Sequence, residues 1–278
     1  MRISCFLFLA GGLLLATAAK AQPADSMKVA RLLEAAAVLP ADSSRALFFA
    51  ERLIGTPYVG GTLDSQNPDE DLIVHLDKLD CTTFVETVAA LVLCDKQQSF
   101  SYASYKQNLT RIRYRGGRRE GYLSRLHYFS DWIADNERKG IVREYTCEIS
   151  PYTWPVSLHF MSSHPEAYPA LKASPALVER LKKLESSWHS FAMPYIPKAW
   201  LDRDFCKLPI RNGSILALTT SVDGLDVSHV GFACWKGGKL HLIHASSQKG
   251  KVILDTLSLY DYQKNKKTHT GVRVISLL

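Results

Sequence analysis

A two-residue Gly237-Gly238 turn between two β-rich segments restricts the fold more than any other feature of this sequence. The flanking segments, residues 227–235 and 240–246, have the composition of strands, and a Gly-Gly pair between such runs predicts a β-hairpin. Further strands are predicted at residues 213–220, 251–255 and 271–277. The C-terminal part of the chain is therefore expected to form an antiparallel sheet.

The register of this hairpin brings two histidines together. Pairing about the turn places Gly231 opposite His244 and His229 opposite Ser246. The two histidines then lie on one sheet face as diagonal neighbours, with backbones about 7 to 8 Å apart. Because Gly231 has no side chain, His244 has space to lean toward His229.

Before this sheet, the sequence predicts helices. One begins at Asp42 or Ser43 and ends at Gly55. Another spans residues 80–93: Asp80 is its N-cap, Thr83 and Glu86 resemble a capping box, and an apolar stripe follows. Cys81 is thus expected in the first turn of a largely buried helix.

Cys81, His229 and His244 have the chemistry of a nucleophile, a base and a group that orients the base. A helix N-terminus favours a thiolate and offers backbone N–H groups to an oxyanion, so a lowered pKa is expected for Cys81 and its own N–H is the natural oxyanion donor. Each residue also has an ordinary explanation, as a small buried thiol or a hydrogen-bonded strand histidine. Their joint occurrence favours catalysis.

The middle of the chain, about residues 95–212, reads as a long and partly helical insertion. Helices are predicted at 124–139 and 176–191, and residues 111–115 alternate as a short strand with three arginines on one face. Residues 106–125 contain seven basic residues and one acid, Glu120. This basic segment is either a solvated face or a site for substrate carboxylates.

Residues 1–21 read as a cleaved secretory signal, so the mature chain is expected to be exported, periplasmic or secreted, as one domain over 22–278. The apolar run is too short for a stable membrane anchor. Removing this segment takes away two basic residues, so the net charge falls from +7 to +5. That balance is too weak to indicate nucleic-acid binding.

Five cysteines remain after removal of the signal, namely Cys81, Cys94, Cys147, Cys206 and Cys234. An odd number leaves at least one free thiol, and both paired and fully reduced states stay open. The histidine pairs His159/His164 and His241/His244 do not form a metal motif, and His241 points away from His244 in the predicted register. No metal and no cofactor are expected.

Four short motifs follow one another along the chain: Pro-Tyr-Val-Gly-Gly at 57–61, Asp-Cys-Thr-Thr-Phe-Val at 80–85, Ser-His-Val-Gly at 228–231 and Ile-His-Ala-Ser at 243–246. They resemble the tyrosine loop, the Asp-Cys-Ser-Gly-Phe-Val nucleophile motif, the histidine motif and the third catalytic position of NlpC-type cell-wall cysteine hydrolases. The resemblance implies a papain-like α+β fold, with N-terminal helices and an antiparallel C-terminal sheet.

The chain departs from that family pattern in two places. Thr82-Thr83 replaces Ser-Gly, and Gly213-Ser214 stands where the family usually has Gly-Asp. The long segment between Cys81 and His229 resembles a larger branch described as N-acetylmuramoyl-L-alanine amidases. That resemblance implies cleavage between the lactyl group of N-acetylmuramic acid and L-alanine.

The sequence therefore predicts an exported cysteine amidase of peptidoglycan or soluble muropeptides, with Cys81, His229 and His244 as the catalytic residues. The resemblance adds Tyr58, Asp80 and Ser228 as substrate-binding residues. One alternative keeps the triad but cuts the γ-D-glutamyl-diaminopimelate bond. Another is a non-catalytic muropeptide-binding protein, in which binding survives the loss of Cys81.

Overall fold

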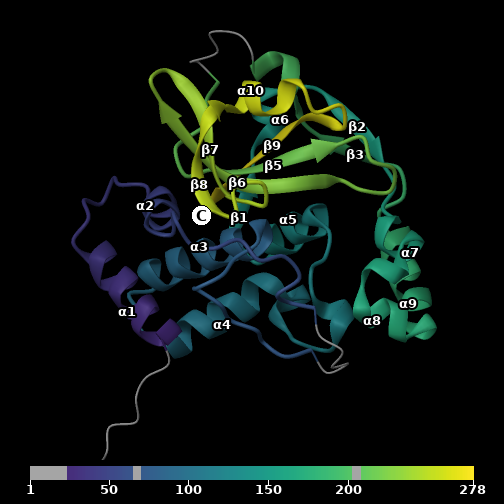
Figure 1. Cartoon of the computed structure of the whole chain (residues 1–278), viewed down its shortest axis with the longest axis horizontal. Coiled ribbons are helices and arrows are strands. Elements are labelled where there is room, and N and C mark those ends of the chain that lie inside the picture. The colour runs from purple at the N-terminus through teal and green to yellow at the C-terminus, as the bar shows by residue number, and fades with distance from the viewer. Residues whose placement is uncertain (1–23, 65–69, 202–207) are drawn as a thin grey trace, which may run out of the picture.

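The computed structural model describes residues 24–64, 70–201 and 208–278. In this part of the chain a mixed α+β fold surrounds one large antiparallel sheet (Figure 1). The sheet has seven strands in the order β1-β9-β5-β6-β7-β8, with β4 also paired to β9. A separate two-stranded sheet joins β2 to β3.

The strands of the large sheet come mainly from the C-terminal third. Their bounds are β1 Val142–Glu144, β4 Ile196–Pro197, β5 Ile215–Thr220, β6 Val227–Lys236, β7 Lys239–Ser246, β8 Lys251–Ser258 and β9 His269–Leu277. The small sheet consists of β2 Thr153–Val156 and β3 Phe191–Pro194. The five C-terminal strands agree with the sequence prediction, whereas β1 to β4 lie in the middle segment and were not predicted.

Helices cover both faces of the sheet. Those on one face are α1 Ala24–Ala37, α2 Arg45–Arg52, α3 Cys81–Lys96, α4 Tyr102–Arg113 and α5 Phe129–Arg138, and α6 Thr146–Ile149 and α10 Leu259–Lys264 lie on the other (Figure 1). Beside them lie α7 Phe160–Ser163, α8 Pro169–Ala173 and α9 Pro175–Ser186. Short 3₁₀ turns are η1 Arg115–Gly117, η2 Tyr122–Ser124, η3 Pro165–Ala167 and η4 Lys198–Leu201.

Alternation along the strands divides the apolar residues between two cores. In β5, Ile215 and Ala217 pack with the core under α1 to α5, while Leu216 and Leu218 pack with the core on the α10 side. This follows from the two-residue period of a strand, which sends successive side chains to opposite faces. A sheet covered on both faces therefore needs the almost continuous apolar sequence that β5 has.

Helix α3 is the central helix of the first core. Thirteen of its 16 residues are buried, and Phe84 packs edge-on against Phe232 of β6, with ring centroids 5.5 Å apart. The N-cap is Asp80, as predicted. The position of Cys81 is therefore fixed by a helix that is held in the core along nearly its whole length.

The predicted strand at residues 111–115 is wrong. Arg111 and Arg113 end α4, and Arg115 begins η1, so the three arginines do not share a strand face. Tyr105, Leu109 and Ile112 are buried at helical spacing, and this longer pattern outweighs the local alternation. The other two predicted helices are shorter than expected: they are α5 and α9, and the predicted end at Phe191 lies in β3.

The predicted cap of α2 is shifted by one residue from Ser43, because the side chain of Ser44 accepts the hydrogen bond from Leu47 N–H.

The proposed signal at residues 1–21, including Cys5, lies outside the described residues, as does Cys206. In the ranges that the structure describes, no helix is both long and apolar enough to cross a membrane.

Candidate active site

Cys81 is the first residue of α3, and the residues around it form a tight helix cap. Thr83 N–H donates to Asp80 Oδ1 at 2.7 Å, and Asp80 N–H donates to Thr83 Oγ1 at 2.9 Å. The capping box therefore joins Asp80 to Thr83 and not, as the sequence suggested, Thr83 to Glu86. Glu86 instead turns into the core and pairs with Arg113.

The hairpin register predicted from the Gly237-Gly238 turn is confirmed, with Phe232 opposite Ile243 and Lys236 opposite Lys239. Both turn glycines have positive φ, 57° and 74°, which suits a turn that matches the strand twist. At Gly231 the strands approach so closely that a Cβ atom would lie 2.5 Å from Ile243 O and 2.9 Å from His244 Cβ.

The two predicted histidines are in direct contact: His229 Nε2 and His244 Nδ1 lie 2.6 Å apart. Their rings are nearly perpendicular, with centroids 4.8 Å apart. The pairing of β5 with β6 shifts register beside Ser228, because Leu218 faces His229 while Thr219 faces Val227. Such a bulge re-aims the neighbouring side chain.

Asp255 of β8 extends this contact, and the sequence analysis did not identify it. His244 Nε2 lies 3.2 Å from Asp255 Oδ2. The β7–β8 pairing has a second irregularity at this point, since Ile243 faces Leu254 but His241 faces Ser258. Asp255 ends the predicted strand 251–255, so only the register of this second hairpin would have linked it to His244.

Tyr262 of α10 covers the histidine pair and was also missed. Its ring stacks beside His229 at 6.3 Å and meets His244 edge-on at 5.4 Å, while Lys266 Nζ lies 3.5 Å from the Tyr262 ring centroid.

Burial holds the pKa of His229 well below its usual value, and His244, Lys266 and His269 add to this shift. Burial also lowers the pKa of His244, against the opposing effect of Asp255.

The expected low pKa of Cys81 is contradicted. Burial and then the nearby Asp80 carboxylate raise the pKa of the thiol to about 11, although hydrogen bonding to the Val230 backbone and to Thr82 opposes the shift. The local helix terminus predicts a thiolate, but the desolvation of a charged sulfur dominates here. The resting site therefore contains a thiol and neutral imidazoles.

Cys81 lies close to the histidine pair without a direct bond to it. No hydrogen bond between the Cys81 thiol and His229 is present in the described residues. The sulfur lies against the backbone of Val230, the residue after His229, and Tyr262 contacts His229 while its own pKa is raised in part by Cys81. Catalytic hydrogen bonds are often long before substrate binds.

The structure puts Tyr58 and Asp80 beside Cys81. The backbone of Tyr58 bridges to Leu79, and burial followed by Cys81 and Asp80 raises the pKa of the Tyr58 hydroxyl. Asp80 is engaged as the helix cap. Ser228 is exposed at the bulge and donates to Leu218 O at 3.4 Å.

The described cysteines Cys81, Cys94, Cys147 and Cys234 are all free thiols. His241 contacts the backbone of Asp255, His159 faces Asp223, and His164 bonds to Phe160 O. No cluster of three potential metal-ligating side chains occurs in the described ranges.

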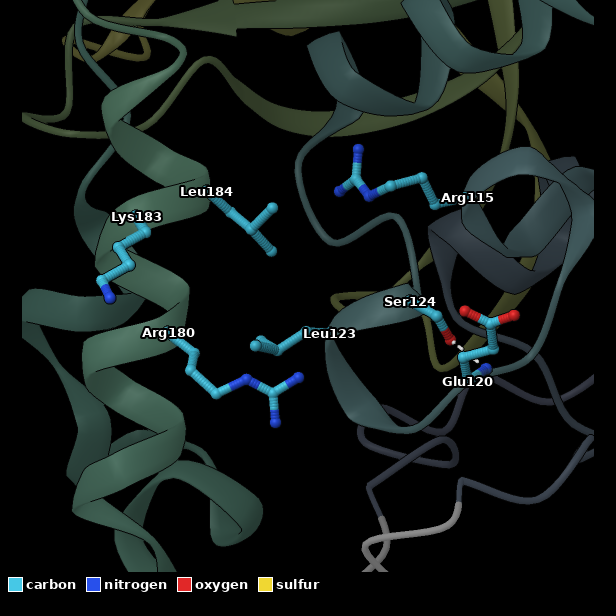
Figure 2. A pocket seen from close by; sticks show the side chains of 7 residues that line it. All are labelled: Arg115, Glu120, Leu123, Ser124, Arg180, Lys183 and Leu184. Carbon is cyan, nitrogen blue, oxygen red and sulfur yellow. Dashed lines mark hydrogen bonds between the residues drawn. The ribbon is translucent and has the colours of Figure 1, made fainter.

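Three of the six arginines in the basic segment form ion pairs within the fold. Arg113 bonds to Glu86, Arg115 to Asp131 and Arg125 to Glu70. A cavity of about 430 Å³ lies between η1, η2 and α9, lined by Arg115, Glu120, Leu123, Ser124, Arg180, Lys183 and Leu184 (Figure 2). Figure 2 shows the Arg180 guanidinium beside Leu123, while the Lys183 side chain points away from the other labelled side chains in this view.

Two of these cavity cations differ from the paired arginines. Neither Arg180 nor Lys183 forms an ion pair with a carboxylate of the described residues, whereas Lys182 on the same helix pairs with Glu179. The cavity thus combines two cations that have no carboxylate partner in the described part of the chain, one carboxylate, Glu120, and the apolar side chains of Leu123 and Leu184.

Comparison with known proteins gives a consistent family. Residues 48–272 match the family model described as AmiA-like, N-acetylmuramoyl-L-alanine amidase-like. A crystal structure of an N-acetylmuramoyl-L-alanine amidase from Bacteroides uniformis is 40% identical with a TM-score of 0.80, and the match covers 84% of this chain and 97% of that chain.

Two further solved structures are similar. One, titled a putative xylanase from Bacteroides fragilis, is 44% identical over 83% of this chain and 100% of that one, with a TM-score of 0.78. A Legionella pneumophila protein of the DUF1460 family model is 25% identical over 91% and 94% of the two chains, with a TM-score of 0.68. No curated protein matches the chain.

Proposed function

The chain belongs to the AmiA-like, N-acetylmuramoyl-L-alanine amidase-like family, and we propose that it hydrolyses the amide bond between N-acetylmuramic acid and L-alanine in peptidoglycan fragments. The contact of His229 with His244 beside Cys81 is the observation that carries this proposal. The three residues supply a nucleophile, a base and an orienting group.

The raised pKa of Cys81 favours a first step in which the thiol loses its proton as it attacks. Because the resting thiol is protonated and His229 is neutral, His229 takes the Sγ proton as the sulfur attacks the carbonyl carbon. In this scheme the backbone N–H of Cys81, the first residue of α3, stabilises the oxyanion. The protonated His229 then gives its proton to the leaving amine, which leaves a thioester on Cys81.

The second half of the reaction uses the same residues. His229 removes a proton from water, the resulting hydroxide attacks the thioester, and the Cys81 sulfur leaves and regains its proton from His229. No metal is needed in this scheme. The same scheme also fits cleavage of a γ-D-glutamyl-diaminopimelate bond, so the bond specificity rests on the family name and not on the triad.

The name of the putative xylanase suggests a different chemistry for that protein. Glycoside hydrolysis uses two carboxyl groups that flank the scissile bond. Asp80 adjoins Cys81 and Asp255 contacts His244, and each carboxylate is already bound within the fold, Asp80 to a helix N-terminus and Asp255 to His244. The site favours acyl transfer.

The relation to NlpC-type enzymes, the papain-like character of the fold and export after removal of residues 1–21 also belong to this proposal. Tyr58, Asp80 and Ser228 line the substrate side. Muropeptides carry several carboxylates, and the cavity with Arg180 and Lys183 offers them a basic surface that the predicted 111–115 strand does not.

The direct test uses one defined disaccharide-tetrapeptide and mass spectrometry of the products. Free disaccharide and intact tetrapeptide support the proposed cut, whereas a disaccharide-dipeptide supports the endopeptidase alternative. Cys81→Ala should lower kcat on the order of 10⁴-fold or more while the folded variant still binds substrate. Cys147→Ala, which removes an exposed free thiol, is the control.

Normal turnover by folded Cys81→Ala protein would eliminate the cysteine mechanism. Substrate binding without any turnover by the wild-type protein would instead support the muropeptide-binding alternative.

A further inference from the structure

We propose that Asp255 is a positioning residue that fixes the tautomers of His244 and His229, so that the lone pair on His229 Nδ1 remains free to accept a proton. The assignment of that proton to Cys81 rests on the proposed function. The tautomers themselves are a property of the folded protein and can be measured without turnover.

Asp255, His244 and His229 form a chain of three groups with a carboxylate acceptor at one end. An ionised carboxylate only accepts hydrogen bonds, so at the 3.2 Å contact His244 Nε2 must carry the hydrogen that it donates to Asp255. A neutral imidazole has one N–H, so His244 Nδ1 is then an acceptor.

The contact between His244 and His229 then fixes the hydrogen position in His229. At 2.6 Å from His244 Nδ1, His229 Nε2 must be the donor, and its other ring nitrogen then has no hydrogen. Burial favours the neutral form of both rings, which keeps each of them to a single N–H. The proton positions in the two histidines thus follow from one carboxylate.

Asp255 is itself held in one orientation. Its Oδ1 accepts a hydrogen bond from Leu257 N–H at 2.9 Å, while Oδ2 faces His244. His241 Nδ1 lies 3.1 Å from the Asp255 backbone carbonyl. His244 pairs with Ile253, and Asp255 stands two residues further along β8, so Asp255 is the diagonal neighbour of His244.

This double engagement makes Asp255→Asn an informative variant. An amide has only one oxygen, and it can occupy only one of the two carboxylate oxygen positions, the one that faces Leu257 N–H or the one that faces His244 Nε2. When the oxygen stays on Leu257 N–H, the amide nitrogen faces His244 Nε2 and donates a hydrogen bond to it. His244 then carries its hydrogen on Nδ1 and donates to His229 Nε2. His229 in turn carries its hydrogen on Nδ1, and that nitrogen cannot act as a base. Asp255→Ala imposes neither tautomer.

A tautomer-setting role and a space-filling role for Asp255 therefore predict opposite orders of kcat for Asp255→Asn and Asp255→Ala. If Asp255 sets tautomers, Asp255→Asn should lower kcat by about 10² to 10⁴, at least as much as Asp255→Ala, with little change in KM. If Asp255 only fills space, the nearly isosteric Asp255→Asn should resemble the wild type and Asp255→Ala should be worse. Asp261→Asn, an equal charge change on α10 where Asp261 binds Ser258 and Lys264, should leave kcat unchanged.

The decisive measurement is nuclear magnetic resonance of the full chain labelled with ¹⁵N in its histidine rings. His229→Gln and His244→Gln spectra assign the two signals. In the wild type, both rings should carry hydrogen on Nε2, and Asp255→Asn should move His229 toward the Nδ1–H form.

A wild-type His229 protonated on Nδ1 would overturn the inference, as would an Asp255→Asn protein with unchanged tautomers. Neither readout depends on cleavage. An inactive wild-type protein with the expected tautomers would refute the proposed function and leave this inference standing.

Discussion

Arg113 and Glu86 form an ion pair inside the first core, with 2.7 Å between Arg113 Nε and Glu86 Oε2 and both side chains at most 3% exposed. Arg113 also donates to Ile73 O. A residue predicted to meet substrate on a strand face is therefore a structural residue that ties α4 to α3.

The first prediction concerns the stability of that pair. Glu86→Gln should lower the free energy of unfolding by about 3 to 5 kcal/mol, because it leaves the Arg113 charge buried without its partner. Glu148→Gln, which breaks the exposed Arg143–Glu148 pair, should cost about 0 to 1 kcal/mol. Urea denaturation measures both. Equal losses would contradict the assignment of Arg113 to the core.

A second prediction concerns acid sensitivity. Burial, then Arg125 and Arg115, lower the pKa of His127 to about 3, while the unfolded chain protonates this histidine near pH 6.5. Between these values the unfolded state binds more protons, so stability falls as the pH falls, by up to about 1.4 kcal/mol per pH unit from this group.

His127→Gln retains a donor for Tyr122 O and should flatten the slope of unfolding free energy against pH between about pH 6 and pH 4. His189→Gln, at an exposed position, is the matched control. Parallel curves for wild type and His127→Gln would show that His127 is not buried as a neutral ring.

A third prediction tests the role of His244. His244→Ala keeps the thiol and the base, so its loss in kcat should be about 10² to 10⁴ and smaller than that of Cys81→Ala. His244→Asn should recover part of this loss, since its carbonyl can accept from His229 Nε2–H.

Combining His244→Ala with His229→Ala should be hardly worse than His229→Ala alone, because an orienting group then has no base to orient. Losses that multiply would mean that His244 acts on the substrate independently of His229. Steady-state kinetics of the four proteins decides between these outcomes.

A fourth prediction concerns the cavity in Figure 2, which takes the place of the predicted strand 111–115 as a candidate site for substrate carboxylates. Replacing Arg180 and Lys183 together by Gln should weaken the binding of the disaccharide-tetrapeptide to Cys81→Ala protein and reduce the salt dependence of its affinity, by about 0 to 1 kcal/mol per charge. Lys182→Gln, which removes a paired cation from the same helix, should have little effect. Calorimetric titration at two salt concentrations measures this. An unchanged affinity at low salt would assign the cavity to ordinary solvated surface.

The parts of the fold that the sequence predicted correctly are governed by local rules. The Gly237-Gly238 turn sets the register of β6 and β7 through backbone conformation, and the N-cap of α3 follows from Asp80. The strand prediction at 111–115 failed because a five-residue window hides the longer helical spacing of α4.

The missed features depend on contacts between distant segments. Asp255 reaches His244 through an irregular strand pairing, and Tyr262 reaches both histidines from a short helix. The pKa of Cys81 reflects burial by the whole fold, which outweighs the helix terminus visible in the sequence.

The attachment of Cys81 to the buried helix α3 has a consequence for thermal inactivation. A nucleophile on a surface loop can lose its alignment while the rest of a protein stays folded. Here Cys81 and Thr82 begin a helix in which every residue from Thr83 to Asp95 is buried, so displacement of the sulfur beyond the first turn requires α3 to leave the core. Loss of activity on heating should therefore coincide with global unfolding, and any substitution that slows unfolding should lengthen the working lifetime of the enzyme equally.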